Sequence, residues 1–171
     1  GSGMPISIPV IDMVEIGAGG GSLAHVDALQ QIRVGPKSAG SEPGPACYGR
    51  HGTRPAVTDA DLVLGKLDPE NFAGGSIRLF PDASRTAIAE YVGTMLDMDA
   101  VEAAFGVAEV VDENMANAAR VHAVENGEDL SEYTMIAFGG AAPLHAGRLA
   151  EKLGVERLLV PPGAGVGSAI G

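Results

Sequence analysis

Residues 11–27 read IDMVEIGAGGGSLAHVD: an apolar stretch, four glycines and a serine, then a second apolar stretch. Glycines lack Cβ atoms, so they allow a tight turn in which several backbone N–H groups face one small target. A second turn of this kind, FGGAAPLHA, occupies residues 138–146 and again follows an apolar stretch. Two strand–glycine turns predict a nucleotide site built between them.

Composition limits the class of protein. The chain has 171 residues, 46% of them hydrophobic and 4% aromatic, which predicts one α/β domain or part of a longer one. The formal net charge of −11 argues against nucleic acid and anionic membrane surfaces as partners. A single cysteine, Cys47, excludes an internal disulfide and favours a reducing, cytoplasmic location. Residues 1–3, before Met4, are typical of a cloning remnant.

Charge is distributed unevenly along the chain. Residues 28–58 carry four basic side chains and one acidic one, whereas residues 97–132 carry ten acidic side chains and one basic one. An anionic ligand would therefore be tolerated beside the first segment. The second is typical of a solvated acidic helix surface.

The first half of the chain predicts two strands, at residues 9–17 and 22–26, paired across the first glycine turn. Residues 28–58, rich in glycine and proline, are expected to form a long loop without regular structure. A short helix is expected at 58–67, capped by Thr58 or Asp59. A further helix is expected at 82–95, with Ile88, Val92 and Met95 on its buried face.

The second half predicts a long helix that begins at Asp99 with a capping box to Glu102 and ends at Gly127. Gly106, inside this helix, implies a close contact with a strand. A buried strand at 133–138, a helix from Pro143 to about Gly154 and a strand at 157–160 complete an α/β layout with mixed strand directions. The apolar spacing predicts a buried stripe on the long helix at Val101, Ala104, Phe105, Ala108, Val111, Met115 and Ala118.

Four stretches in this order, IDMVEIGAGGGSLAHVD, GPKSAGSEPGPACYG, VTDADLVLGKL and AFGGAAPLHA, resemble the hydantoinase A/5-oxoprolinase family over nearly all of residues 4–171. The resemblance implies an α/β fold of the actin–hexokinase–Hsp70 (ribonuclease H-like) ATPase class, with a mixed sheet flanked by helices. It also implies that residues 4–171 form one lobe, because the family's first phosphate loop is absent. The family's GGAGP is GGAAP here, with Ala142 in place of glycine.

The resemblance assigns the first glycine turn to phosphate. Backbone N–H groups of Gly19, Gly20, Gly21 and Ser22 would bind the β- and γ-phosphates of ATP. Glu15 would act through water on a nucleotide-bound Mg²⁺, with no metal ligand directly from the protein. The alternative is a glycine hairpin without a ligand.

The second turn and the long helix would bind the nucleoside. Gly139, Gly140 and Ala141 would lie against adenosine, or else simply pack a strand on a helix. Glu113 and Asn114 would reach the ribose or base, with solvated helix surface as an equal alternative.

Other polar residues have weaker assignments. His25 and Asp27 point to one face of their strand and are candidate catalytic groups, or merely cover the sheet edge. Cys47 would need activation to act as a nucleophile, and a buried thiol that packs a turn is the favoured interpretation. For His145, packing or capping is favoured.

The implied function is the nucleotide-binding part of an ATP-dependent hydrolase that opens cyclic amides such as hydantoin, N-methylhydantoin or 5-oxoproline. A hydantoinase B-type subunit or domain would be its partner, and homo-oligomers are possible. Two alternatives remain open: an acetone or acetophenone carboxylase subunit, and a catalytically inactive fragment.

Overall fold

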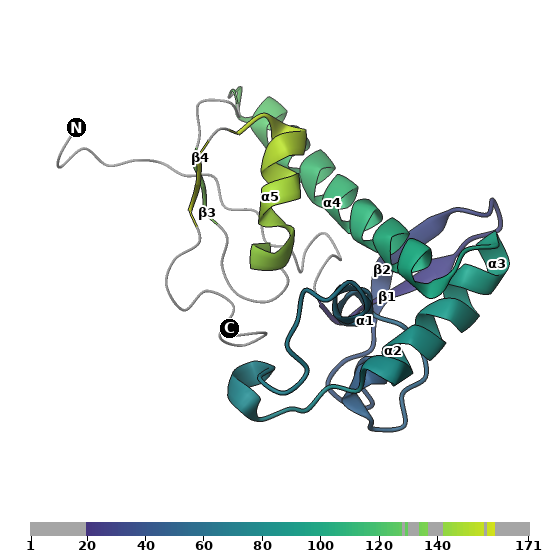
Figure 1. Cartoon of the computed structure of the whole chain (residues 1–171). Helices are drawn as coiled ribbons and strands as arrows, with labels where there is room; N and C mark the ends of the chain where they lie inside the picture. The colour runs from purple at the N-terminus through teal and green to yellow at the C-terminus, as the bar shows by residue number, and fades with distance from the viewer. Residues whose placement is uncertain (1–19, 128, 130–133, 137–141, 156, 160–171) are drawn as a thin grey trace.

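The computed structural model of the chain describes residues 20–127, 129, 134–136, 142–155 and 157–159. A long helix, α4, runs across the molecule, with a β-hairpin near its N-terminal part and helix α5 beside its C-terminal half (Figure 1). The strands are β1 (Ser22–Val26), β2 (Ile32–Ser38), β3 (Thr134–Ile136) and β4 (Arg157–Leu159). The α-helices are α1 (Val57–Val63), α2 (Pro81–Ile88), α3 (Thr94–Leu96), α4 (Ala100–Glu125) and α5 (Ala142–Leu153).

The hairpin corrects one prediction. Strand β1 was expected, but its observed partner is β2, which pairs with it antiparallel and lies inside the segment 28–58 that was expected to lack regular structure. That expectation is wrong because Asp27 supplies the turn: its Oδ1 accepts from the backbone N–H groups of Leu29 and Gln31 at 2.9 and 3.0 Å. The expected strand at 9–17 lies outside the described residues.

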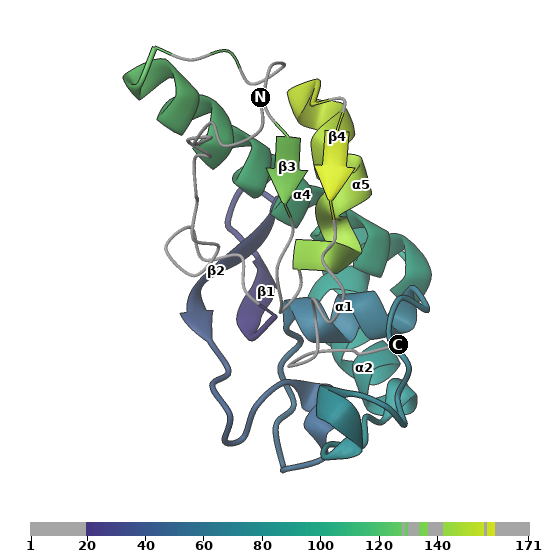
Figure 2. The same ribbon diagram turned by 90° about the vertical axis from the view of Figure 1, so that its left-hand side faces the viewer.

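The second sheet agrees with the prediction. Strands β3 and β4 pair in parallel, with Thr134 opposite Arg157, and α5 connects them (Figure 2). A parallel pair requires such a crossover because the chain must return to the same end of the sheet. The expected strand–turn–helix–strand order is therefore confirmed for its described part.

Helix α4 has the predicted ends. The N–H of Glu102 donates to Asp99 Oδ1 at 2.8 Å, and the N–H of Asp99 donates to Glu102 Oε1 at 3.2 Å, which is the expected capping box. Gly127 adopts φ 64° just beyond the helix. A Cβ on Gly106 would lie 2.7 Å from Ile32 Cδ1, so the close helix–strand contact is confirmed.

The buried stripe of α4 was predicted only in part. Ala104, Ala108, Val111 and Met115 are buried, but Val101 and Phe105 are 56% and 59% exposed. At 100° per residue these two share a side with Asp112, Ala116 and Ala119. Helix α5 packs along the C-terminal half of α4 and buries that side there. Over the first turns no described element covers it.

The expected helix at 82–95 is interrupted. Helix α2 begins with Pro81 in its first turn, and a π-helical segment, Ala89–Gly93, separates it from α3. Ile88 and Val92 are buried as predicted, but Met95 is 56% exposed. The π turn shifts the register by one residue, so Leu96, not Met95, packs against the core.

Helix α1 lies between the two hydrophobic clusters of the core. Val57 and Ala60 belong to the larger cluster, with β1, β2, the π-helical segment and α4, and Leu62 belongs to the smaller cluster around Cys47 and Phe72. The helix is shorter than predicted because Gly65 adopts φ 75° soon after its end. Within the described part of the chain, no helix has the length and apolar character needed to cross a membrane.

Candidate functional site

The described part of the first glycine turn is Gly20–Ser22, directly before and at the start of β1. The Gly20 carbonyl accepts from both the N–H and the Oγ1 of Thr58, each at 2.9 Å, and the Gly21 carbonyl accepts from the N–H of Ala39 at 2.8 Å. In a trans peptide the N–H points opposite to the carbonyl. The Gly21 N–H is therefore directed away from Thr58, and the Ser22 N–H is directed away from Ala39.

Close packing explains the glycines at this turn. A Cβ on Gly20 would lie 2.8 Å from Thr58 Oγ1, and one on Gly21 would lie 3.0 Å from Ser38 Oγ. A side chain at Gly20 would displace Thr58, and one at Gly21 would press on Ser38. Gly19 and Glu15, the other predicted members of this site, lie outside the described residues, as do Gly139, Gly140 and Ala141 of the second turn.

Helix α1 carries three buried polar side chains, which is unusual for a helix of seven residues. Thr58, Asp59 and Asp61 are 6%, 0% and 1% exposed. Buried polar groups need partners, and each of these side chains finds them on a different part of the molecule. Thr58 holds the glycine turn, as described above.

Asp59 is the second of the three. Its carboxylate accepts from the N–H groups of Ala46 (3.2 Å), Cys47 (2.9 Å) and Ala56 (2.7 Å), and from the Ser84 hydroxyl at 2.6 Å. The N-cap of α1 is Ala56 and not Thr58 or Asp59 as predicted, because the helix begins earlier than expected; Asp59 lies in its first turn and accepts from the Ala56 N–H. Asp59 also ties α1 to α2 and to the short 3-10 turn Ala46–Tyr48, called the Cys47 turn below. Burial and then the Asp59 charge raise the pKa of the Cys47 thiol, so this buried cysteine is a packing residue and not an activated nucleophile.

Asp61, the third, contacts His145 of α5, whose other ring nitrogen contacts Asp112 of α4. Nδ1 lies 2.8 Å from Asp112 Oδ1, and Nε2 lies 2.9 Å from Asp61 Oδ1 and 3.2 Å from its Oδ2. Only the Oδ2 contact has hydrogen-bond geometry, so Asp61 Oδ1 is a buried acceptor without a hydrogen bond.

The charge state of His145 follows from these neighbours. Burial alone lowers its pKa, but the hydrogen bonds and charges of Asp112 and Asp61 outweigh that effect and raise the pKa to about 9. The imidazole is therefore charged at neutral pH, and both ring N–H groups are used. This assigns His145 a role in joining α1, α4 and α5, consistent with the expected packing role.

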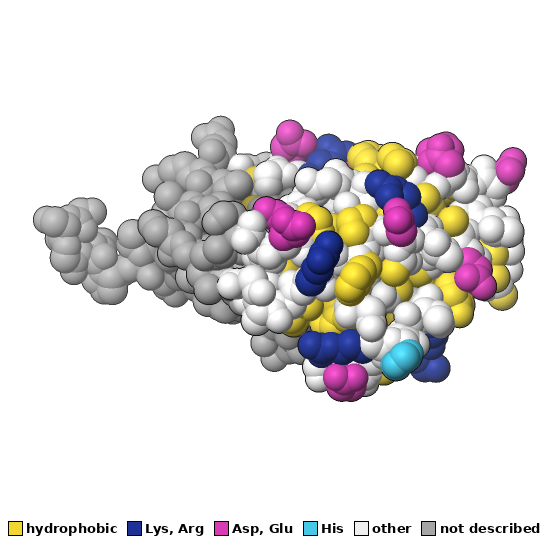
Figure 3. Space-filling view, turned by 60° about the horizontal axis from the view of Figure 1, so that its bottom comes forward, with side chains coloured by type: hydrophobic (Ala, Val, Ile, Leu, Met, Phe, Trp, Pro, Cys, Tyr) yellow, Lys and Arg dark blue, Asp and Glu magenta, His cyan; other side chains and the backbone are white. Residues whose placement is uncertain are grey.

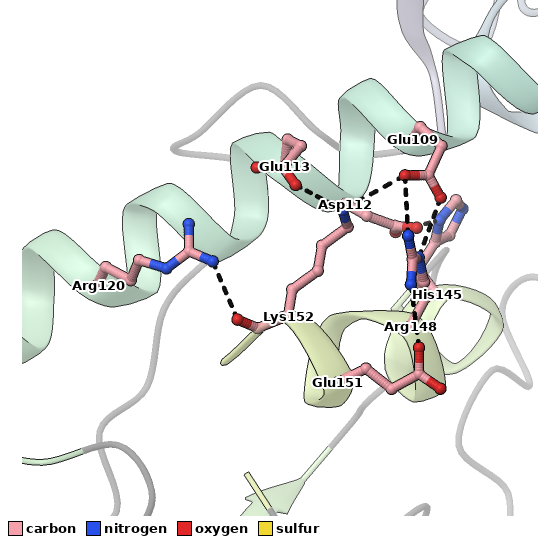
Figure 4. A network of polar contacts seen from close by, with 8 residues as sticks. All are labelled: Glu109, Asp112, Glu113, Arg120, His145, Arg148, Glu151 and Lys152. Carbon is pink, nitrogen blue, oxygen red and sulfur yellow. Dashed lines mark hydrogen bonds and ion pairs between the residues drawn. The ribbon is translucent and has the colours of Figure 1, made fainter. Parts of the chain in front are cut away.

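Glu113 lies on the outer side of the same α4–α5 contact (Figure 4). Its carboxylate pairs with Lys152, which also contacts Glu109 at 3.3 Å, and Arg148 contacts Glu109 at 3.1 Å. The Lys152 hydrogen bond holds the pKa of Glu113 below its usual value. Glu113 thus has a protein partner, and half-buried Asn114 follows it on α4. Contacts of either with a nucleotide stay predictions.

The structure does not bring the predicted catalytic groups of β1 to the glycine turn. Asp27 lies beyond the far end of β1 from Gly21, where it accepts from Arg33 Nε at 2.9 Å and closes the hairpin. This hydrogen bond lowers the pKa of Asp27. His25 pairs opposite Arg33 in the hairpin. The catalytic roles of both stay predictions.

The expected excess of positive charge near the turn is partly neutralised. Arg33 pairs with Asp27, and Arg50 lies 3.5 Å from Glu42. On the face shown in Figure 3, basic, acidic and apolar side chains are interspersed. Among the described residues, no group of three or more His, Cys, Asp or Glu side chains is arranged to hold a metal ion.

Sequence reasoning missed Asp61 and Asp112. A signal for Asp112 was present, because at helical spacing it falls among Ala108, Met115, Ala116 and Ala119, all of which are buried. A carboxylate within an apolar stripe predicts a buried partner. Asp61 lies between Ala60 and Leu62 in a helix too short to show such a stripe.

Comparison with known proteins gives one family. The family model Hydantoinase/oxoprolinase matches residues 2–171. The chain is 42% identical to caprolactamase subunit alpha of Pseudomonas jessenii over 91% of its length, which is 22% of that protein. It is 39% identical to the acetophenone carboxylase gamma subunit of Aromatoleum aromaticum over 97% of its length, again 22% of the relative. The chain thus spans about a quarter or less of the curated relatives it matches.

Solved structures of related proteins share the fold. The ATP-dependent caprolactamase of Pseudomonas jessenii superposes with a TM-score of 0.80 at 42% identity, over 88% of this chain and 22% of that one. Nucleotide-free acetone carboxylase, which carries out ATP-dependent acetone carboxylation, superposes with a TM-score of 0.78 at 30% identity, over 86% and 21%. The expected fold class, an actin-like ATPase lobe, is confirmed by these neighbours.

Proposed function

The chain belongs to the hydantoinase/oxoprolinase family, and from that premise we propose that it forms the nucleotide-binding part of an ATP-dependent hydrolase that opens cyclic amides. The caprolactamase and acetone carboxylase neighbours are both ATP-dependent. The chain has the same fold over most of its length, so it is expected to use the same nucleotide.

The observation that carries this proposal is the packing of Gly20 and Gly21. Their carbonyls are held by Thr58 and Ala39, and a Cβ at either position would lie within 3.0 Å of a side-chain hydroxyl, that of Thr58 or that of Ser38. Each following N–H points opposite to its preceding carbonyl, so the Gly21 N–H is directed away from Thr58 and the Ser22 N–H away from Ala39. Backbone N–H groups fixed in this way are suited to bind phosphate oxygens.

In the proposed reaction the amide oxygen of the ring takes the γ-phosphoryl group of ATP and ADP leaves; water then attacks the activated carbon, the ring C–N bond breaks, and inorganic phosphate is released. The role of this chain would be to hold the triphosphate and to stabilise the charge of the transferring phosphoryl group. Gly19, Gly20, Gly21 and Ser22 would contact phosphate, and Gly139, Gly140 and Ala141 would contact adenosine. Mg²⁺ would arrive with the nucleotide, and Glu15 would contact it through water.

A carboxylase subunit is the second candidate. It is favoured by the acetophenone carboxylase relative, which is nearly as similar to this chain as caprolactamase subunit alpha. Both relatives are named as subunits, which supports a partner subunit here. For the hydrolase, that partner would be of the hydantoinase B type.

The test of nucleotide binding is calorimetric titration of the chain with Mg·ATP and Mg·ADP, with Gly20→Ala and Gly147→Ala as a matched pair. A Cβ at position 20 would lie 2.8 Å from Thr58 Oγ1, whereas a Cβ at Gly147 in α5 would have no neighbouring atom within 4 Å. We expect Gly20→Ala to weaken binding about tenfold, about 1.4 kcal/mol, and Gly147→Ala to leave it within twofold. Equal binding by both variants would contradict a phosphate role for this turn.

A second assay separates the two candidate activities. ATP hydrolysis by the full-length protein with its partner subunit is measured with a cyclic amide and, separately, with a ketone plus bicarbonate. Stimulation by the amide alone supports the hydrolase, and stimulation only by ketone plus bicarbonate supports the carboxylase.

A further inference from the structure

Two side chains of α1 connect the first glycine turn to helix α5. Thr58 contacts the first glycine turn, and Asp61 contacts His145 in the first turns of α5. In sequence, α5 begins directly after Gly139–Ala141. We propose that α1 is the spacer that sets the phosphate-binding turn relative to α5, and that His145 is a positioning residue for ATP. This inference rests on the proposed function.

At the phosphate end, α1 is hydrogen-bonded directly to the glycine turn. Thr58 donates twice to the Gly20 carbonyl, from its N–H and from its hydroxyl, both at 2.9 Å. One bond comes from the helix backbone itself, so a displacement of α1 displaces Gly20. The turn is thus attached to α1 and not only to its own hairpin.

The α5 end is held by charge as well as by hydrogen bonds. Asp61, His145 and Asp112 are 1%, 1% and 2% exposed, and the imidazole contacts a different carboxylate through each nitrogen. Because both nitrogens are engaged inside the protein, His145 has no free nitrogen with which to exchange a proton with substrate. Its effect on the site must therefore act through the position of α5.

The spacing along α1 is one helical turn. Thr58 and Asp61 are three residues apart, so their side chains leave neighbouring positions about 5–6 Å apart. Asp59 anchors the other side of the helix to the Cys47 turn and to Ser84 of α2. A short helix held at three points cannot tilt toward one site without breaking contacts at another.

Stability alone does not account for this arrangement. Replacement of a buried ion cluster by apolar residues of similar volume is often neutral or stabilising, because two or three charges must be desolvated. Directional contacts, in contrast, specify one relative placement of the elements they join. Asp61 Oδ1, buried without a hydrogen bond, shows that the cluster is not optimised for hydrogen bonding.

The test uses two ligands of different reach. ATP must contact both the phosphate turn and the nucleoside side, whereas magnesium pyrophosphate needs only the phosphate turn. A change in relative placement lowers affinity for the longer ligand alone, because its two ends no longer bind together. We compare the dissociation constants of Mg·ATP and magnesium pyrophosphate for His145→Gln and for Arg148→Gln. Arg148 lies on the same helix, and its replacement removes ion pairs to Glu109 of α4 and Glu151 of α5, neither of which is on α1.

We expect His145→Gln to raise the Kd for Mg·ATP about tenfold and to leave that for pyrophosphate within twofold, and Arg148→Gln to change neither. If His145→Gln does not fold, Asp61→Asn replaces it, with the same expectation. Unchanged ATP binding, or an equal loss for both ligands, overturns the spacer and leaves the proposed function standing. Absence of ATP binding by the unmodified chain overturns both.

Discussion

Nδ1 of His145 lies 2.8 Å from Oδ1 of Asp112, and neither side chain is more than 3% exposed. The contact joins α5 to the middle of α4, 33 residues earlier in the chain. Asp61 of α1 contacts the other ring nitrogen, so the cationic imidazole of His145 links three helices, α1, α4 and α5. Its protonation state therefore affects the stability of the whole described core.

The first prediction concerns pH. The pKa of His145 is about 9 in the folded chain against 6.5 for an unperturbed histidine, so folding favours the protonated form. Its contribution to stability is fully present below pH 6.5 and is lost as the pH rises through 9. On the order of 3 kcal/mol of unfolding free energy should disappear across this window, at about 1.4 kcal/mol per pKa unit. Urea unfolding at several pH values measures it.

The control for this prediction is His145→Gln, which cannot titrate. Cys47 and Tyr48, whose pKa values burial also raises, lie outside the cluster and respond in both proteins at higher pH. The difference between the two stability curves therefore isolates the imidazole, which faces Asp61 from α1 and Asp112 from α4. Parallel curves from pH 6.5 to 9 would show that His145 is neutral in the folded chain.

The second prediction is that Asp59→Asn destabilises the fold strongly. The substitution keeps the shape of the side chain but replaces one carboxylate oxygen with an NH2 group, which cannot accept a hydrogen bond. This amide would face some of the four donors of Asp59, which are three backbone N–H groups and the Ser84 hydroxyl. Bonds to a charged group contribute about 1.5–3 kcal/mol each, so a loss of about 3 kcal/mol in unfolding free energy is expected. Asp82→Asn is the matched control, since the Asp82 side chain is fully exposed and forms a surface ion pair with Arg85. It should change stability by less than about 0.5 kcal/mol. Similar losses for both would contradict a structural role for Asp59.

Local sequence patterns predicted the ends of α4 correctly, whereas the exposure of its side chains depends on tertiary contacts. The Asp99–Glu102 capping box, the end of α4 at Gly127 and the close approach at Gly106 all follow from short-range rules, and all are confirmed. Exposure of Val101 and Phe105 could not be predicted from spacing. It depends on where α5 stops along α4, which is a property of the assembled fold.

In the candidate site, too, some residues could be predicted from the sequence and others only from the structure. The glycine turn could be recognised from the sequence as a run of glycines, and the close contacts at Gly20 and Gly21 agree with it. The residues that hold the site together could not be recognised in this way, since Thr58 and Asp61 resemble ordinary helix residues until their burial is known. Strand β2 was missed because Gly35 and Pro36 interrupt its alternating pattern.

The third prediction concerns Cys47, the single cysteine of the chain. It is 0% exposed, and burial raises its pKa, so thiolate is scarce and inaccessible in the folded state. A thiol reagent such as iodoacetamide should label it only when the protein opens, with full labelling in urea and little in buffer at pH 8. Ser84→Ala, which removes one hydrogen bond to Asp59 beside the thiol, should accelerate labelling by weakening the α1–α2 contact. Rapid labelling of the unmodified folded chain would contradict the buried placement.

The fourth prediction separates helix propensity from packing at Gly106. Alanine inside a helix is normally about 1 kcal/mol more favourable than glycine, but here its Cβ would lie 2.7 Å from Ile32 Cδ1. In the unmodified chain Gly106→Ala should therefore gain little or lose stability. Ile32→Val removes the Cδ1 atom, so in that background Gly106→Ala should stabilise by about 1 kcal/mol. The double-mutant cycle, measured by urea unfolding, should show a coupling of about 1 kcal/mol.

An equal effect of Gly106→Ala in both backgrounds would contradict the contact. A positive coupling means that Gly106 brings β2 against α4, and with it the hairpin whose first residues complete the phosphate-binding turn.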